Sequence, residues 1–388
     1  MNMSEPSALT LGVLQCEGTG TLPFAEAEYC RKLCIAGRKH GIRVIVFSPL
    51  WIQWGDCTVH AFVYEKSRWE RRTFPLPRLA YDRCAYSNPQ QYRKTQAAII
   101  RMKQLANVTL LGIGLRGKWD IYRSMRKDLS LSPILPPTRL FAGISSLAAL
   151  LNRYHGGLFL KPHGGTHGKS TLHVRYRDND KEKTDSISAA LPGTLELRGR
   201  DDDNHPIQHS FSRPQEGFAW IEQFVGKRRF VIQPYLSLVT QEGEPFDVRV
   251  LMQKNGNGRW VLTGMAARVG QPDSVTSNLH GGGRAVSVIP FLESQFEPNH
   301  VHRLIEQLST YSEYIPPLLE AQYGRISEIG LDYGIDRKAR PWLLEVNSKP
   351  GRSVFRHTGE YEAALQSVEN PILYARHVLV RYLRRVSS

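Results

Sequence analysis

The sequence predicts a mixed α/β protein with about two or three structural units. The chain has 388 residues, and one domain commonly contains about 100–200 residues. Hydrophobic residues make up 41% of the chain and charged residues 22%, so a sizeable core can form. Short apolar runs typical of buried strands alternate with segments of helical spacing. This alternation is typical of strands connected by helices.

The N-terminal part of the sequence predicts a small α/β domain. Residues 9–14 form an apolar run, residues 25–39 have helical spacing, and residues 43–47 (R-V-I-V-F) resemble a buried strand. This order gives a strand, a helix and a second strand. Further strands are expected at 79–83 and 108–112, and a helix at 89–106. We therefore interpret residues 1–115 as one α/β domain.

The rest of the chain alternates between predicted helices and strands in the same way. Helices are expected at residues 118–127, 144–154, 218–225, 299–318 and 371–385. Strands are expected at residues 157–162, 171–176, 230–234, 246–252, 260–268, 329–335 and 342–347. The polar segment 177–217 is expected to contain exposed strands and a long loop.

Composition restricts the classes of function. The formal net charge is +15, which predicts attraction to polyanions. The basic residues are scattered, so we interpret them as a solvated surface and rank nucleic acid last among the partners. The longest apolar stretches fall short of the ~20 residues that span a bilayer, and the N-terminus has no signal-peptide pattern. We expect no membrane span and a cytoplasmic location.

The cysteines predict neither a zinc site nor a disulfide framework. They are Cys16, Cys30, Cys34, Cys57 and Cys84. Their number is odd, and the close pair Cys30 and Cys34 has no second half. Buried, reduced thiols are the favoured interpretation.

A glycine-rich loop joins two predicted strands, and Lys161 ends the first of them. The loop contains Gly164, Gly165 and Gly168. It is not a Walker A loop, because His163 occupies the position of the first glycine and the loop leads into a strand, not a helix. A mobile glycine hairpin can fold over phosphates while Lys161 directs a positive charge at them. An ordinary hairpin with a solvated lysine is the alternative.

A hairpin near the C-terminus is the strongest indication of a functional site. Reflection about a turn midpoint between Lys338 and Ala339 pairs Asp332 with Glu345, provided that no bulge intervenes. Asn347 lies two residues beyond Glu345 and therefore shares its face. Two carboxylates and one amide oxygen are donors that suit Mg²⁺, especially Mg²⁺ that is also held by nucleotide phosphates. Solvated charges on an exposed face are the alternative.

The middle of the chain holds weaker candidates. A strand ends in a segment whose backbone could bond to an adenine edge, formed by Gln233, Pro234, Tyr235 and Leu236. Asp247 and Arg249 share one strand face, where a structural salt bridge is the alternative role. Arg268 ends the next strand and could meet a phosphate, and Asn278 lies in a second glycine loop that could wall the site.

In their order along the chain, these features resemble the ATP-grasp enzymes, and more narrowly the YheC/YheD group associated with endospore coats. The resemblance covers nearly the whole chain. It implies an α/β (α+β) fold, with a small N-terminal pre-ATP-grasp domain followed by an ATP-grasp domain at 116–388. The two subdomains would be 116–235, with the glycine loop, and 236–388, with the metal hairpin.

The resemblance also implies roles for the candidate residues. Phosphates would be contacted by Lys118, Lys161 and the loop glycines, and adenine by the hinge at 233–236. Asp247 would lie near the ribose. Mg²⁺ would be held by Asp332, Glu345 and Asn347, and the γ-phosphate and acceptor would face Arg268 and Asn278. Two departures stand out: many ATP-grasp hinges have Glu where this chain has Gln233, and the loop has His163, Thr166 and His167 where Ser or Gly is frequent.

The activity that the resemblance implies is ATP- and Mg²⁺-dependent ligation of a carboxylate to an amine through an acyl-phosphate, in spore or spore-coat formation. The carboxylate and the amine are unknown, and spore-coat proteins are expected partners. The second hypothesis is a nucleotide-binding, coat-associated structural protein without turnover. A nucleic-acid binder is the third.

Overall fold

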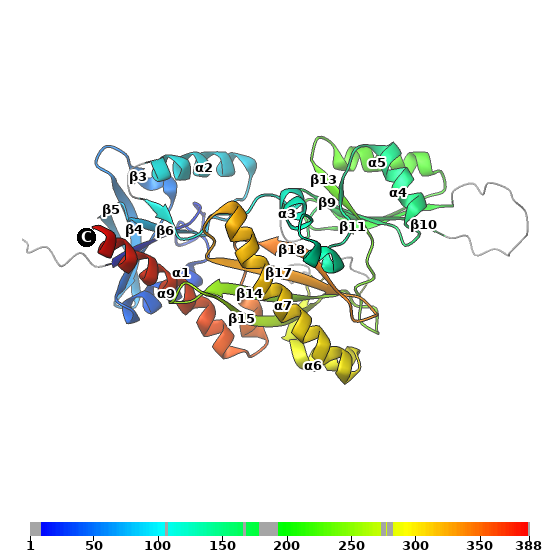
Figure 1. Ribbon diagram of the computed structural model, residues 1–388. Helices are drawn as coiled ribbons and strands as arrows, with labels where there is room; N and C mark the ends of the chain where they lie inside the picture. Colours follow the sequence, from blue (N-terminus) through cyan, green and yellow to red (C-terminus); the bar gives the residue numbers. More distant parts are fainter. Residues whose placement is uncertain are drawn as a thin grey trace, which may run out of the picture.

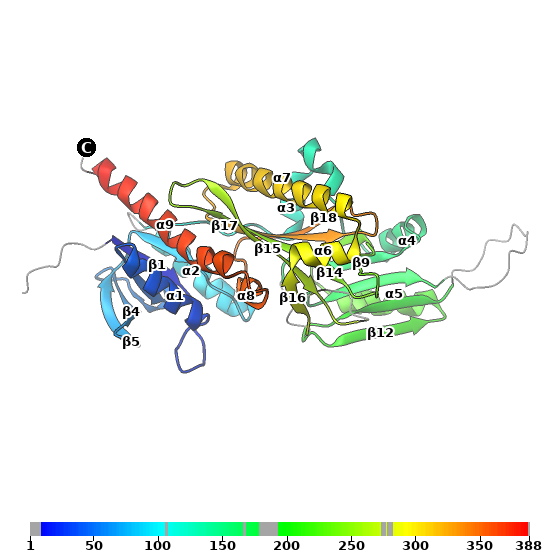
Figure 2. The same ribbon diagram turned by 90° about the horizontal axis from the view of Figure 1, so that it is seen from below.

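The structure is a computed structural model that describes residues 9–104, 108–165, 168–177, 193–272, 277 and 282–386. The strands in this part of the chain form three sheets, arranged one after another along an elongated molecule (Figure 1, Figure 2). We call them the N-terminal sheet (β1–β7), the glycine-loop sheet (β8–β13) and the central sheet (β14–β18). No helix in the described ranges is long and apolar enough to cross a membrane.

The N-terminal sheet confirms the predicted strand–helix–strand unit. The helices α1 (Ala27–Lys39) and α9 (Tyr361–Val386) pack on one face, and α2 (Pro89–Gln104) packs on the other. Strands β1, β2, β6 and β7 pair in parallel, while the hairpin β4–β5, which the sequence analysis did not predict, is antiparallel. The strands are β1 (Leu9–Leu14), β2 (Ile42–Phe47), β3 (Ile52–Gln53), β4 (Thr58–Glu65), β5 (Arg68–Pro75), β6 (Leu79–Asp82) and β7 (Thr109–Leu110), in the order β3-β4-β2-β1-β6-β7 with β5 beside β4.

The glycine-loop sheet is antiparallel and carries its core against α4 (Ile144–Arg153) and α5 (Pro214–Val225). The predicted helix 218–225 is thus the C-terminal part of a longer helix that begins at Pro214, because proline is favourable in a first helical turn. The strands are β8 (Arg139–Leu140), β9 (Leu158–Pro162), β10 (Thr171–Tyr176), β11 (Leu195–Arg200), β12 (Pro206–Phe211) and β13 (Phe230–Pro234), in the order β12-β11-β10-β9-β13-β8.

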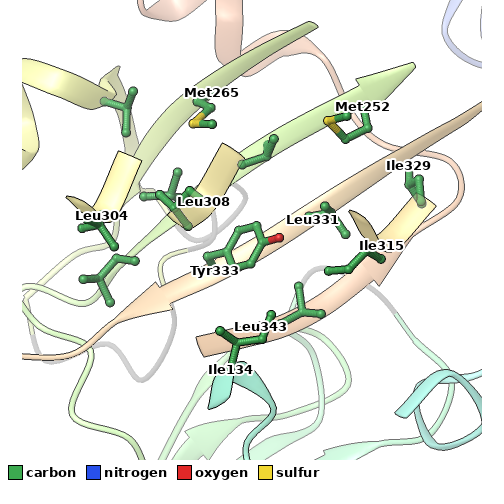
Figure 3. Close-up of a cluster of buried hydrophobic side chains, with 14 of the residues drawn as sticks. Ile134, Met252, Met265, Leu304, Leu308, Ile315, Ile329, Leu331, Tyr333 and Leu343 are labelled. Atoms are coloured by element: carbon green, nitrogen blue, oxygen red, sulfur yellow. The ribbon is translucent and has the colours of Figure 1, made fainter. Parts of the chain in front are cut away.

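The central sheet lies between the other two and holds the largest core (Figure 1). Its apolar face packs against α3 (Lys118–Met125), η2 (Leu129–Ile134), α6 (Val288–Gln295) and α7 (Pro298–Tyr323), and α8 (Ser353–His357) packs on the opposite face. Figure 3 shows Leu331, Tyr333 and Leu343 of the sheet facing Leu308 and Ile315 of α7. The strands are β14 (Phe246–Lys254), β15 (Trp260–Val269), β16 (Arg284–Ser287), β17 (Glu328–Ile335) and β18 (Pro341–Asn347), in the order β16-β15-β14-β17-β18.

The hairpin β17–β18 pairs Asp332 with Glu345, as predicted, but its turn centre and its register differ from those expected. Ile335 pairs with Pro341, so the turn is centred on Lys338, half a residue earlier than expected. A β-bulge at Leu344 then adds one residue to β18 and restores the predicted pairing. The assumption that no bulge intervenes was therefore wrong.

The C-terminal helix is longer than the sequence analysis expected. The sequence predicts Pro371 as its first residue, but α9 begins at Tyr361 and Pro371 lies inside it. The prediction was wrong because proline is read as a helix start, although a helix can tolerate an internal proline when tertiary packing compensates for the lost hydrogen bond. Ile372 and Ala375 of this helix are fully buried against the N-terminal sheet.

Candidate active site

The predicted site residues converge on one cleft between the glycine-loop sheet and the central sheet. Its volume is about 300 Å³. The predicted residues that line it are Lys118, Lys161, Gly165, Gly168, Gln233, Pro234, Tyr235, Leu236, Asp247, Arg268, Asp332, Glu345 and Asn347. Gly164 lines a larger neighbouring cavity instead. Asn278 lies outside the described residues, so its role stays a prediction.

Lys161 reaches from β9 across the cleft to the central sheet. Its Nζ donates a hydrogen bond to the Leu344 carbonyl at 2.9 Å. Burial lowers the pKa of Lys161 to about 8, although the Glu345 and Asp332 carboxylates counteract this shift. The lysine is therefore already directed into the cleft, and it is mostly protonated at neutral pH.

Asp332 is surrounded by positive charge. The Arg249 guanidinium pairs with both carboxylate oxygens, and Nη2 of Arg268 lies 3.1 Å from Oδ2. Burial opposes the ionisation of Asp332, but the two guanidiniums outweigh burial and lower the pKa of its carboxyl to about 2. Nδ2 of Asn347 also donates to Asp332 Oδ2 at 3.2 Å, which leaves the amide oxygen for another partner.

Glu345 and the glycine loop share one cation, Lys118. The Lys118 Nζ lies 3.1 Å from Glu345 Oε1 and donates to the Gly165 carbonyl at 2.6 Å. The start of α3 is held in place by His163, whose carbonyl accepts from the Lys118 backbone N–H at 3.0 Å. The sequence analysis left His163 without a role, because a contact between loop and helix is not visible in a local pattern.

The predicted hinge lies at the apolar end of the cleft. Gln233 is buried and its Nε2 donates to Thr138 Oγ1 at 2.8 Å. The Tyr235 ring stacks on His173, with ring centroids 3.6 Å apart. Burial lowers the pKa of His173 to about 4, so the imidazole is neutral at pH 7. Aromatic and apolar side chains, among them Phe159, Tyr235 and Leu236, line the cleft here and suit an aromatic ring.

Asp247 is the partner of Arg268, not an isolated acid. Arg268 donates to both Asp247 oxygens, at 2.6 and 2.7 Å, and Ser277 Oγ donates to Oδ2 at 2.5 Å. The register of β14 and β15 sets Asp247 opposite Arg268. The structure thus assigns Asp247 a positioning role for Arg268, and its predicted contact with a ribose stays a prediction.

Lys169 and Lys349 also line the cleft, and the sequence analysis did not single them out as site residues. Lys349 follows Asn347 by two residues, and its Nζ lies 2.8 Å from Asp82 Oδ1. It also borders a second cavity of about 1630 Å³, which adjoins the first and is walled by the N-terminal sheet. Lys349 therefore lies between the cleft and the second cavity. In the sequence, the only sign of this role is its position just after the end of a predicted strand.

The chemistry of the predicted metal ligands suits Mg²⁺. Among the described residues, no group of three or more His, Cys, Asp or Glu side chains could hold a metal ion. Asp332, Glu345 and Asn347 supply two carboxylates and one amide oxygen, the hard donors that Mg²⁺ prefers. They fit an ion that takes its remaining ligands from phosphates and water, in a cleft where the basic side chains outnumber the acidic ones.

The architecture is that of the ATP-grasp fold. Residues 107–378 match the model of the YheC/D-like ATP-grasp family, and the chain belongs to this family. It is 27% identical over 343 residues to the endospore coat-associated protein YheC of Bacillus subtilis (strain 168), covering 88% of this chain and 90% of that protein. It is 25% identical to the endospore coat-associated protein YheD of the same organism, covering 86% and 70%.

A solved structure, the D-cycloserine synthetase DcsG, shares the fold. The two chains superimpose with a TM-score of 0.54 over 96% of this chain and 99% of that chain, at 12% sequence identity. At this identity the likeness concerns the fold alone. It confirms the predicted fold class, while the boundaries of the domains stay a prediction.

Proposed function

We propose that the protein is an ATP- and Mg²⁺-dependent ligase that joins a carboxylate to an amine through an acyl-phosphate. One observation carries the proposal: Lys118, Lys161 and Arg268 meet Asp332 and Glu345 in a single cleft. Fixed cations and a carboxylate pair at one point are what phosphoryl transfer requires, because this reaction depends on positioning and charge stabilisation. The aromatic and apolar lining beside them suits adenine.

Several residues of the cleft would bind ATP and stabilise the transferred phosphoryl group. Lys118 and Lys161 bind the phosphates and stabilise the charge that develops on the transferred group. Arg268, held by Asp247, faces the same region. Asp332, Glu345 and Asn347 would hold Mg²⁺, which when bound supplies charge neutralisation on the phosphates. The second cavity, about 1630 Å³, leaves room for the carboxylate and the amine beside Glu345.

The proposal is tested by incubating the full chain with ATP, Mg²⁺ and a spore or cytosol metabolite extract. We expect ADP release together with new masses that appear only with ATP. Glu345→Gln is the most informative variant, because Glu345 is only half-buried. A change of Asp332 would also break its pairs with Arg249 and Arg268. We expect a loss of turnover of about 100-fold or more.

Glu222→Gln, on the exposed side of α5, is the matched control and should behave like the wild type. Wild-type turnover in Glu345→Gln would remove the metal assignment.

A second candidate is a coat-associated nucleotide-binding protein without turnover. It is favoured by the names of YheC and YheD, which describe coat association and no reaction. Tight ATP binding with no phosphate release in any extract would support it over the ligase. For both candidates we propose a role in spore or spore-coat formation, which the names of these two relatives support; the cytoplasmic location stays a prediction.

A further inference from the structure

Cys16 and Cys84 lie next to each other at the ends of two parallel strands. The register of β1 and β6 pairs Leu14 with Asp82, the last residue of each strand, and two residues past these ends the Cys16 and Cys84 thiols meet in a hydrogen bond. The Arg83 N–H donates to the Leu14 carbonyl at 3.0 Å, so the pairing continues past the strand ends. Neighbouring strands are about 4.8 Å apart, within the Cα separation of about 4.4–6.8 Å that a disulfide spans.

The environment of the two thiols favours one thiolate. A hydrogen bond with the Cys84 thiol lowers the pKa of Cys16, and the Lys349 ammonium adds to this effect against the opposing effect of burial. The same hydrogen bond raises the pKa of Cys84, so Cys16 is the thiol of the pair that ionises first. Elsewhere in α1, burial raises the pKa of Cys34 to about 11.

Access to the pair is restricted to small molecules. Cys16 and Cys84 are 3% and 1% exposed, but Cys84 borders the cavity of about 1630 Å³. A peroxide is little larger than water and can diffuse through such a cavity, whereas a bulky disulfide reagent cannot reach a thiol this deeply buried. The Lys349 Nζ also donates to the Cys84 carbonyl at 3.0 Å, which places the thiol pair directly behind the wall of the cleft.

We propose that Cys16 and Cys84 form a modification site that reacts with a hydroperoxide and closes to an intramolecular disulfide. The thiolate attacks one peroxide oxygen, the O–O bond breaks, and hydroxide leaves to give a sulfenic acid. The second thiol loses its proton and attacks this sulfur, displacing the hydroxide. Two thiols and one hydrogen peroxide thus give one disulfide and two waters. The site is independent of the proposed ligase activity.

The test treats the reduced full chain with hydrogen peroxide, blocks the remaining thiols after unfolding, and maps the peptides by mass spectrometry. We expect a Cys16–Cys84 peptide with two fewer hydrogens, formed about 10-fold faster than any link through Cys30 or Cys34. Cys34→Ser is the control and should keep the link. In Cys84→Ser, Cys16 should stop at the sulfenic acid, which a dimedone probe labels.

The proposal is overturned if peroxide oxidises the exposed Cys57 while Cys16 and Cys84 stay reduced, or if the links formed are random. Peptide mapping of the wild type decides this even if Cys84→Ser fails to fold. A bulky aromatic disulfide reagent should modify Cys57 and leave the pair unlabelled in the folded chain.

Discussion

The Lys161 ammonium donates its hydrogen bond to the carbonyl of Leu344, the bulged residue of β18. A bulged residue is left out of the ladder, so its carbonyl is free to accept from another element. The same bulge sets Leu343 in the core and Glu345 in the cleft, although an unbroken strand would place residues two apart on one face. The bulge therefore directs the Glu345 carboxylate into the cleft and also supplies the carbonyl that binds the Lys161 ammonium.

Lys161→Met should weaken ATP binding by about 10-fold or more, because a fixed cation is lost from the phosphate site. The wild-type affinity should also depend on pH. The pKa of Lys161 is about 8, so the charge is present below this pH and is lost as the pH rises through it. Calorimetric titration at pH 7 and 9 should show about 10-fold weaker binding at the higher pH.

Lys161→Arg is the control for this pH dependence, since a guanidinium stays charged over the whole range. Its affinity for ATP should change little between the two pH values. Equal pH dependence in both proteins would show that another group titrates.

Local sequence patterns were sufficient for most elements but not for the partners of the charged residues. Alternation and turn chemistry placed Asp332, Glu345 and Asn347 on one face, because a hairpin brings together residues close in the chain. The links of Asp332 to Arg249 and Arg268 depend on the order and register of strands far apart in the sequence. No local pattern specifies these ion pairs. The sequence therefore predicts Asp332 as a metal ligand but does not predict its two arginine partners.

Other differences between prediction and structure have separate physical causes. The bulge at Leu344 cancelled an error in the turn centre, so the pairing was predicted correctly for a partly wrong reason. The hairpin β4–β5 was missed because its second strand is mostly exposed and rich in charge, as in R-W-E-R-R. The neighbouring thiols Cys16 and Cys84 lie two residues beyond the ends of β1 and β6, and only the parallel pairing of these strands shows that they are close.

Asp332→Asn should remove an acid-sensitive part of the stability. The pKa of Asp332 falls from its ordinary 3.8 to about 2 on folding. A carboxyl whose pKa is lowered stabilises the fold above its ordinary pKa, and this contribution is lost as the pH falls from about 4 to 2. Its size is about 2 kcal/mol. Urea unfolding should give a gap between wild type and variant that is widest near neutral pH and narrows over this interval.

Asp247→Asn should destabilise the fold by about 2–3 kcal/mol, because it removes the two-point carboxylate partner of the buried Arg268 and leaves only Asp332, which Arg249 shares. Ser277→Ala, which removes only one hydrogen bond to Asp247, should cost about 1 kcal/mol. The matched control is Glu244→Gln, which breaks the more exposed pair with Arg284 and should cost under about 1 kcal/mol. Denaturant midpoints measured on the three variants should follow this order, and a cost for Asp247→Asn no larger than the control would contradict it.

Glu328→Gln should be among the most destabilising single changes at the junction of the N-terminal and central sheets. Glu328 is 2% exposed, accepts from the Tyr81 hydroxyl at 2.5 Å, and pairs with Arg83 and Arg352. Burial opposes its ionisation, but the two guanidiniums lower its pKa, so it carries its charge at pH 7. The amide keeps the shape and removes the charge, leaving two buried guanidiniums undercompensated at a cost of about 3–5 kcal/mol.

The control variant, Glu26→Gln, changes the other carboxylate that pairs with Arg83. The Glu26 side chain is 34% exposed, so water can compensate for the lost charge and the variant should cost much less. Equal shifts of the urea midpoint in the two variants would show that Glu328 does not hold the sheets together.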